Sequence, residues 1–189
     1  MADVTTHARG RARLDEVLAR TRVPLGFVFG AVVLWLAQPT FRSLAIGGVV
    51  AAAGEVLRVW AAGHLEKGRE ITRSGPYRLT RHPLYTGSAL IGAGVAIASA
   101  RWIVAGLVAA YLVPTIVSAI RHEEANMRAA FGGGPDSAES YDAYVASRAT
   151  PVDRAFSMER ALRNKEYRAI AGLAVMAAVF AFKVIWRVR

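Results

Sequence analysis

Apolar residues gather in five long runs along this chain of 189 residues, and polar residues gather between the runs. The runs, each rich in Ala, Val, Leu, Ile or Gly, are Val23–Gln38, Phe41–Leu65, Tyr85–Ala100, Trp102–Ile120 and Ile170–Trp186. A soluble protein would interleave apolar and polar residues at the period of a helix or a strand. Since a membrane-crossing helix needs about 20 mostly apolar residues, the pattern predicts an all-α, polytopic bundle of about five transmembrane helices.

Short turns join the first four runs into two helical hairpins. Gln38-Pro39-Thr40 separates the first pair of runs, and Ser99-Ala100-Arg101 separates the second pair. We therefore expect a single membrane domain, with four spans over residues 23–120 and a C-terminal span over residues 169–189. The first run is short for a crossing, and helix tilt or local bilayer thinning would make up the difference.

The charged residues favour one orientation of this bundle. Lys and Arg are enriched in the tail 1–22, the loop 64–83 and the segment 121–168, which places these regions on the cytoplasmic side. The net charge of +10 is consistent with nucleic-acid binding, but basic loops beside apolar spans are explained more simply by anionic lipid. With five spans, Lys183, Arg187 and Arg189 at the end of the last run would lie on the side opposite the cytoplasm, where Lys and Arg are not enriched. The sequence does not explain this. The chain has no cysteine, which excludes disulfides, thiolate metal sites and a cysteine nucleophile.

The stretch Gly75–Gly87 has the most unusual composition of the polar regions. Its prolines and first glycine disfavour a continuous helix before residue 83, so we expect an irregular loop followed by a helix that starts at Pro83 or Leu84. Free backbone N–H groups at that start, with Arg81 and His82 beside them, would suit an anionic group. The alternative is a basic loop that only sets topology.

Two acidic features stand out as well. Glu123 and Glu124 follow the fourth run directly, so hairpin topology brings them to the same surface as the 75–87 loop. An anionic side facing a cationic side suits a zwitterionic cofactor, whereas the alternative is a solvated helix end. Glu55 and Arg58 lie three residues apart within the second run and can pair on one helix face. Their alternative role is a structural ion pair.

The order of these motifs resembles the membrane-embedded superfamily of isoprenylcysteine carboxyl methyltransferases and phospholipid methyltransferases, in a small bacterial branch. The motifs that carry the resemblance are Gly75-Pro76-Tyr77, Arg81-His82-Pro83-Leu84-Tyr85-Thr86-Gly87, Glu123-Glu124, Phe131-Gly132, Tyr141-x-x-Tyr144, residues 57–65 and Asn164-Lys165-Glu166-Tyr167-Arg168. Residues 133–140 resemble an insertion relative to this pattern.

The resemblance implies an integral membrane enzyme, in a bacterial inner membrane, whose site faces the cytoplasm. It also implies S-adenosylmethionine as cofactor and a lipophilic acceptor, either an isoprenylcysteine-like carboxylate or a phospholipid headgroup. The residues it implies for cofactor binding are Gly75, Pro76, Tyr77, Arg81, His82, Pro83, Tyr85, Gly87, Glu123 and Glu124. We expect Arg58 to orient an anionic acceptor group, and Glu55, His64 or His82 to accept a proton where the acceptor must lose one.

Two other functions fit the same pattern. A membrane reductase could use a nicotinamide cofactor on a lipid double bond, although the chain has no Rossmann-type glycine fingerprint. A non-catalytic lipid-binding protein could retain the same fold. We predict no metal site and no nucleic-acid partner.

Overall fold

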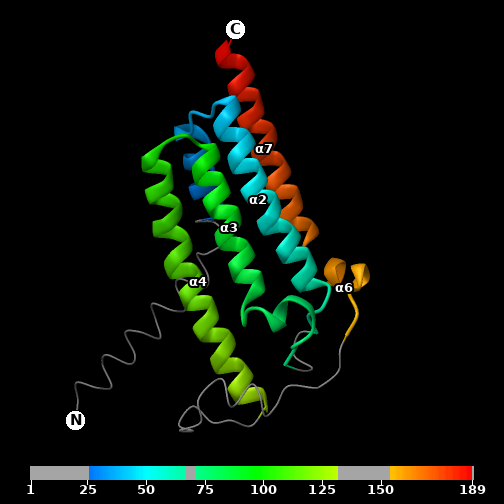
Figure 1. Cartoon of the computed structure of the whole chain (residues 1–189). Coiled ribbons are helices and arrows are strands. Elements are labelled where there is room, and N and C mark those ends of the chain that lie inside the picture. The colour runs from blue at the N-terminus through cyan, green and yellow to red at the C-terminus, as the bar shows by residue number, and fades with distance from the viewer. Residues whose placement is uncertain (1–25, 67–70, 132–153, 189) are drawn as a thin grey trace, which may run out of the picture. The chain divides into compact units, whose positions relative to one another are not determined.

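The structure is a computed structural model that describes residues 26–66, 71–131 and 154–188. These residues form helices joined by turns and contain no β-strand, so the all-α prediction is confirmed. The elements after residue 36, drawn in Figure 1, are α2 (Phe41–Ala62), η1 (Gly75–Arg78), α3 (Pro83–Ala98), α4 (Trp102–Phe131), α6 (Met158–Arg163) and α7 (Tyr167–Val188). A further apolar helix, Gly26–Leu36, belongs to a separate compact unit that ends at residue 36.

Three helices are long and apolar enough to cross a membrane. They are Phe41–Ala62, Trp102–Met127 and Tyr167–Arg187. Two predicted spans are shorter in the described residues: α3 has 16 residues, and the first apolar helix is described only from Gly26 to Leu36. At a rise of about 1.5 Å per residue, α3 is about 24 Å long, somewhat less than the hydrocarbon core. The protein is therefore an integral membrane bundle of long and short helices.

Helix α3 lies between α2 and α4 (Figure 1), and small residues allow it to pack closely on both sides. A Cβ atom on Gly47 of α2 would lie 2.4 Å from the carbonyl oxygen of Gly94 on α3. About two helical turns further along α2, Gly54 faces Gly87 of α3 in the same way. Without a side chain at these positions the two backbones can approach more closely than other residues permit.

Contacts at the start of α2 show how α7 runs. Thr40 caps α2, accepting a hydrogen bond from the backbone N–H of Ser43 at 3.1 Å. Just before this cap, the Ala37 carbonyl accepts a hydrogen bond from Lys183 near the end of α7, and Gln38 N–H binds the Ser99 carbonyl. The end of α7 therefore lies at the same end of the bundle as the α3–α4 turn, opposite the loop 75–83.

Helix α4 is longer than the apolar run that predicted it. The apolar run ends at Ile120, but the helix continues to Phe131. Pro114, within the run, does not interrupt it. His122, Glu123 and Glu124 therefore lie on an extension of the helix, where His122 is exposed and the two glutamates are half-buried.

Candidate functional site

The loop between α2 and α3 has the irregular backbone that its prolines predicted. Gly75 has φ = 58°, a left-handed conformation that favours glycine, and it begins the short 3₁₀ helix η1. Gly75 also lies against the ring of His64, because an added Cβ would be 2.7 Å from three of its ring atoms. Helix α3 then begins at Pro83, as expected, with His82 in the capping position. The loop is thus folded back onto the end of α2.

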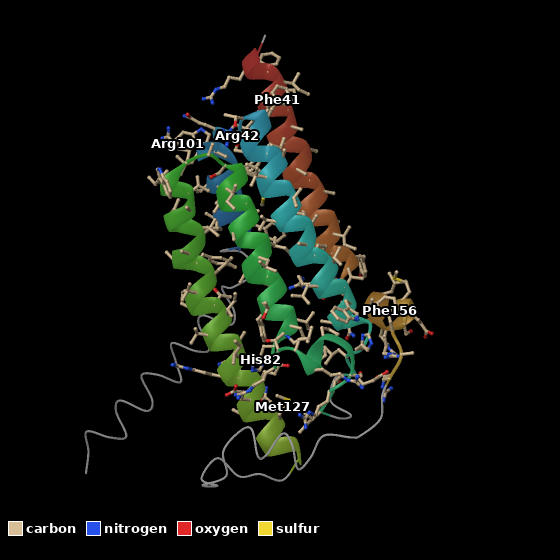
Figure 2. All side chains as sticks on the ribbon, viewed as in Figure 1. Phe41, Arg42, His82, Arg101, Met127 and Phe156 are labelled. Carbon is tan, nitrogen blue, oxygen red and sulfur yellow. The ribbon has the colours of Figure 1, made fainter. Side chains whose placement is uncertain are left out.

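The two predicted halves of the site meet at His82 and Glu124. The Nε2 atom of His82 lies 3.3 Å from Oε1 of Glu124, although the residues are 42 positions apart. Both side chains are partly exposed, so they are accessible to a ligand, and the ring of Tyr85 lies 6.0 Å from that of His82. The α3–α4 hairpin therefore brings the basic loop and the acidic pair together, and Figure 2 shows His82 beside the part of α4 that leads to Met127.

Tyr77 lies in η1, within the loop between α2 and α3. Burial raises the pKa of Tyr77 well above its usual value near 10, and the negative charges of Glu123 and Glu166 raise it further. The Tyr77 hydroxyl therefore stays protonated and can donate a hydrogen bond.

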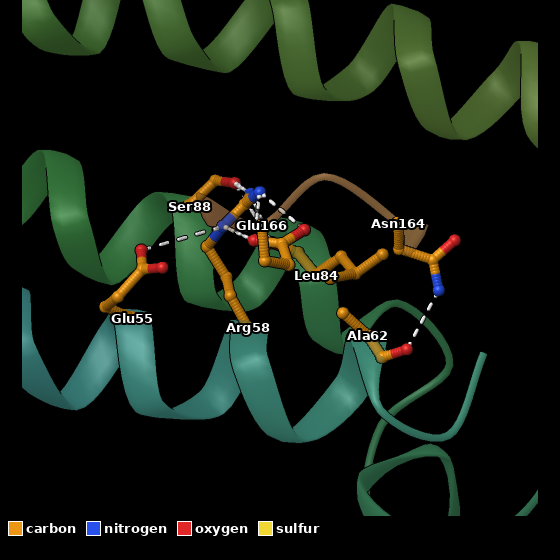
Figure 3. Close-up of polar contacts among 7 residues, drawn as sticks. All are labelled: Glu55, Arg58, Ala62, Leu84, Ser88, Asn164 and Glu166. Atoms are coloured by element: carbon orange, nitrogen blue, oxygen red, sulfur yellow. Dashed lines mark hydrogen bonds and ion pairs between the residues drawn. The ribbon is translucent and has the colours of Figure 1, made fainter. Parts of the chain in front are cut away.

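Arg58 is the centre of a polar cluster within the bundle (Figure 3). Its Nη2 atom lies 2.9 Å from Oε2 and 3.1 Å from Oε1 of Glu166, and its Nε atom donates to Oε2 at 3.2 Å. Its Nη1 atom donates to the Ser88 hydroxyl at 2.5 Å and to the Leu84 carbonyl at 3.5 Å. The guanidinium group is thus held by α3 on one side and by Glu166 on the other.

The expected pair between Glu55 and Arg58 is present only as a contact of 4.0 Å. Glu55 is 8% exposed, and neither of its carboxylate oxygens has a hydrogen-bond partner. The main partner of Arg58 is Glu166 rather than Glu55, because both oxygens of the Glu166 carboxylate accept hydrogen bonds from the planar guanidinium. The site therefore contains a buried carboxylate with unused hydrogen-bonding capacity.

A short turn before α7 directs Glu166 inward. The Asn164 side chain donates to the carbonyls of Ala62 and Leu65 at 2.9 and 3.1 Å, which fixes the turn to the end of α2. Lys165 has φ = 64°, an unusual conformation for a non-glycine residue, and the next residue, Glu166, is 6% exposed. Sequence reasoning assigned no role to Glu166, although its motif was part of the family resemblance.

The remaining candidate residues occupy different surroundings. His64 is buried, and its Nδ1 atom lies 2.9 Å from the Trp60 carbonyl, so this nitrogen carries the proton that it donates there. Gly87 is buried against Gly54 and Arg58 at the α2–α3 contact, and Pro83 is buried at the start of α3. Arg81 is exposed on the loop. No group of three or more metal-binding side chains occurs among the described residues.

Comparison with known proteins identifies the family. The family model for phospholipid methyltransferases matches residues 22–134, which is more than half of the chain. The chain belongs to the phospholipid methyltransferase family. No curated protein and no solved structure matches it. The predicted resemblance is confirmed, and the chain is a membrane methyltransferase whose matched region includes Arg58, His82 and Glu124 but ends before Glu166.

Proposed function

We propose that this family member transfers a methyl group from S-adenosylmethionine to a lipophilic acceptor that it meets within the bilayer. The observation that carries the proposal is the contact between His82 and Glu124, where a basic loop and an acidic helix face meet. S-adenosylmethionine has a carboxylate, an ammonium group and ribose hydroxyls, so it needs both donors and acceptors near one another. The proposed orientation places this surface on the cytoplasmic side of a bacterial inner membrane.

The chain's own groups would bind the cofactor in two ways. The backbone N–H of Gly75 and the side chains of Arg81, His82 and Tyr85 would offer hydrogen-bond donors, and the backbone of Pro76 and Tyr77 would shape the loop around the cofactor. The carboxylates of Glu123 and Glu124 would accept hydrogen bonds from ribose or amino groups. Pro83 and Gly87 would contribute through backbone shape, since one starts α3 and the other lets it approach α2.

The proposed chemistry is an in-line displacement on the methyl carbon. The cofactor supplies an activated methyl group, whose bonding electron pair stays on the departing sulfur. The protein would align the acceptor and exclude water, which are its main contributions to such a reaction. In this proposal Glu55, whose buried oxygens have no hydrogen-bond partner, or His82 accepts the acceptor's proton where there is one to lose.

Arg58 has a more restricted role than the sequence predicted. The guanidinium group of Arg58 is bound by Glu166, so an anionic acceptor group would need to share this guanidinium with the Glu166 carboxylate. We propose that Arg58 instead orders the acceptor side of the site through its bond to Ser88. Arg58, Glu55 and His82 remain the proposed catalytic set.

Isothermal titration of the purified protein in detergent, with S-adenosylmethionine and a nicotinamide cofactor in parallel, tests the proposal. We expect the methyl donor to bind and Glu124→Gln to weaken its binding about tenfold or more, because a hydrogen bond to a charged group is lost. Glu159→Gln, an exposed acid on α6, is the matched control and should leave affinity unchanged. Transfer of a labelled methyl group into a membrane-lipid extract should accompany binding.

Two outcomes would contradict this proposal. Binding of the nicotinamide cofactor alone would favour a membrane reductase. Binding of neither compound by the folded protein would favour a non-catalytic lipid-binding protein.

A further inference from the structure

Several arginines converge on one carboxylate oxygen beyond the end of α2. Glu66 Oε1 lies 3.5 Å from Nε of Arg160, 3.2 Å from Nη2 of Arg163 and 3.6 Å from Nη1 of Arg154. These arginines come from the segment that leads into α6 and from α6 itself, whereas Glu66 follows α2. None of these residues belongs to the proposed methyl-transfer site.

The negative charge in this cluster does not balance the positive charge. Glu66 is the only carboxylate in the described part of the chain that pairs with Arg160 or Arg163, and these two guanidinium groups share its charge with Arg154. The Arg160 side chain is only 13% exposed, and its Nη1 atom is buried without a hydrogen-bond partner. Buried donors of this kind are nearly always satisfied in folded proteins. The cluster therefore has an excess of positive charge and an unsatisfied hydrogen-bond donor, and one more anion would satisfy both.

The position of the cluster indicates which anion this is. It lies just beyond Ala62 and just before Tyr167, the adjoining ends of two membrane-crossing helices. Phe156, Met158 and Leu162 beside it are 43%, 57% and 53% exposed, and Figure 2 shows Phe156 at this end of α2. Apolar side chains next to arginines at the end of a membrane span are typical of a helix that lies in the headgroup region.

We propose that Arg160 and Arg163 form a binding site for the phosphate of an anionic membrane phospholipid, with Phe156, Met158 and Leu162 against its chains. A guanidinium group matches the geometry of phosphate oxygens, and the unused Nη1 of Arg160 supplies a donor. Glu66 is the internal counter-charge that a bound lipid supplements. The segment from residue 154 to 168 has five cations and two acids, one of which is bound to Arg58, so its net charge also favours an anionic lipid.

Native mass spectrometry of the full-length protein in a nonionic detergent, titrated with short-chain lipids, tests this site. Phosphatidylglycerol should bind at least fivefold more tightly than phosphatidylcholine or diacylglycerol. Arg160→Gln and Arg163→Gln should each weaken phosphatidylglycerol binding at least fivefold, and Arg160→Lys should weaken it less. The control is Arg101→Gln at the opposite end of the bundle, which should have no effect.

Glu66→Gln separates a lipid site from a purely structural network. Because Glu66 already neutralises part of the charge of the arginines, its removal should tighten phosphatidylglycerol binding and increase the thermal stabilisation that this lipid gives. Weaker binding in Glu66→Gln, or unchanged binding in both arginine variants that remain folded, would overturn the proposal. Displacement of the lipid by an equal concentration of inorganic phosphate would overturn the assignment to lipid. These results do not depend on whether the protein transfers methyl groups.

Discussion

The ion pair between Arg58 and Glu166 makes a specific prediction about stability. Glu166→Gln keeps the size of the side chain but removes the charge that faces the guanidinium at 2.9 Å. The Glu166 side chain is 8% exposed and that of Arg58 is 21% exposed, so water can replace little of the lost interaction. We expect the free energy of unfolding to fall by about 3 kcal/mol, the lower end of the range for a buried pair that loses one partner.

The double variant decides whether the loss comes from the pair itself. With Arg58→Gln and Glu166→Gln together, neither member of this pair is left as a buried charge facing a neutral partner, so the two losses should not add. We expect a coupling energy of about 1.5–3 kcal/mol from the double-mutant cycle. Glu55 provides the matched control, because it lies 4.0 Å from Arg58 and makes no hydrogen bond to it. Its coupling with Arg58 should be smaller than that of Glu166, because no hydrogen bond joins the two side chains.

The assay is reversible unfolding in mixed micelles, followed by circular dichroism, for the wild type and the single and double variants. Cofactor affinity of each variant checks that the cytoplasmic loop has kept its structure. A coupling below about 0.5 kcal/mol between Arg58 and Glu166 would refute the pairing. Coupling of Arg58 with Glu55 that equals or exceeds its coupling with Glu166 would show that Glu55 is the true partner.

Two further predictions concern the packing and topology of the bundle. Gly87→Ala would place a Cβ atom 2.5 Å from Cγ of Arg58, so it should destabilise the protein by about 1–3 kcal/mol in thermal unfolding. Gly48→Ala, where nothing lies within 4 Å, should be neutral or stabilising, and equal effects of the two changes would contradict the close α2–α3 contact. Single cysteines at residues 75 and 125 should be labelled by an impermeant maleimide only in permeabilised cells, whereas Arg187→Cys should be labelled in intact cells. The reason is that α7 ends beside the start of α2, and labelling of all three cysteines from one side would contradict it.

The helices were predictable because their signals are local. Apolar run length predicted α2, α4 and α7, and the prolines of the loop predicted that α3 starts at Pro83 or Leu84, where the structure has Pro83. The end of α4 was not predictable from the same signal, because a helix can leave the membrane and continue in water. The apolar run ends at Ile120 while the helix persists to Phe131.

The site was predictable only where topology limited the choices. A hairpin must return to the surface that it left, which is why the contact between His82 and Glu124 could be anticipated. The partner of Arg58 could not, because Glu166 is 108 residues away in a polar segment that contains several other acids. A local rule favoured Glu55, three residues before Arg58 on the same helix. The tertiary contact prevailed because the turn at Asn164 and Lys165 presents both Glu166 oxygens to the guanidinium.

The choice of partner for Arg58 determines the net charge of the membrane-embedded part of the site. Arg58 and Glu166 neutralise each other, which leaves Glu55 with two buried oxygens that no described group binds. Arg58 offers Glu55 a positive charge at 4.0 Å but no hydrogen bond, and a buried carboxylate without a hydrogen-bond donor is costly, so a ligand that supplies a donor would suit this position. We propose that Glu55 is the carboxylate that meets the acceptor, whereas Glu166 fixes the position of Arg58. Stability should therefore depend chiefly on Glu166, and turnover chiefly on Glu55, although the two carboxylates lie on either side of the same arginine.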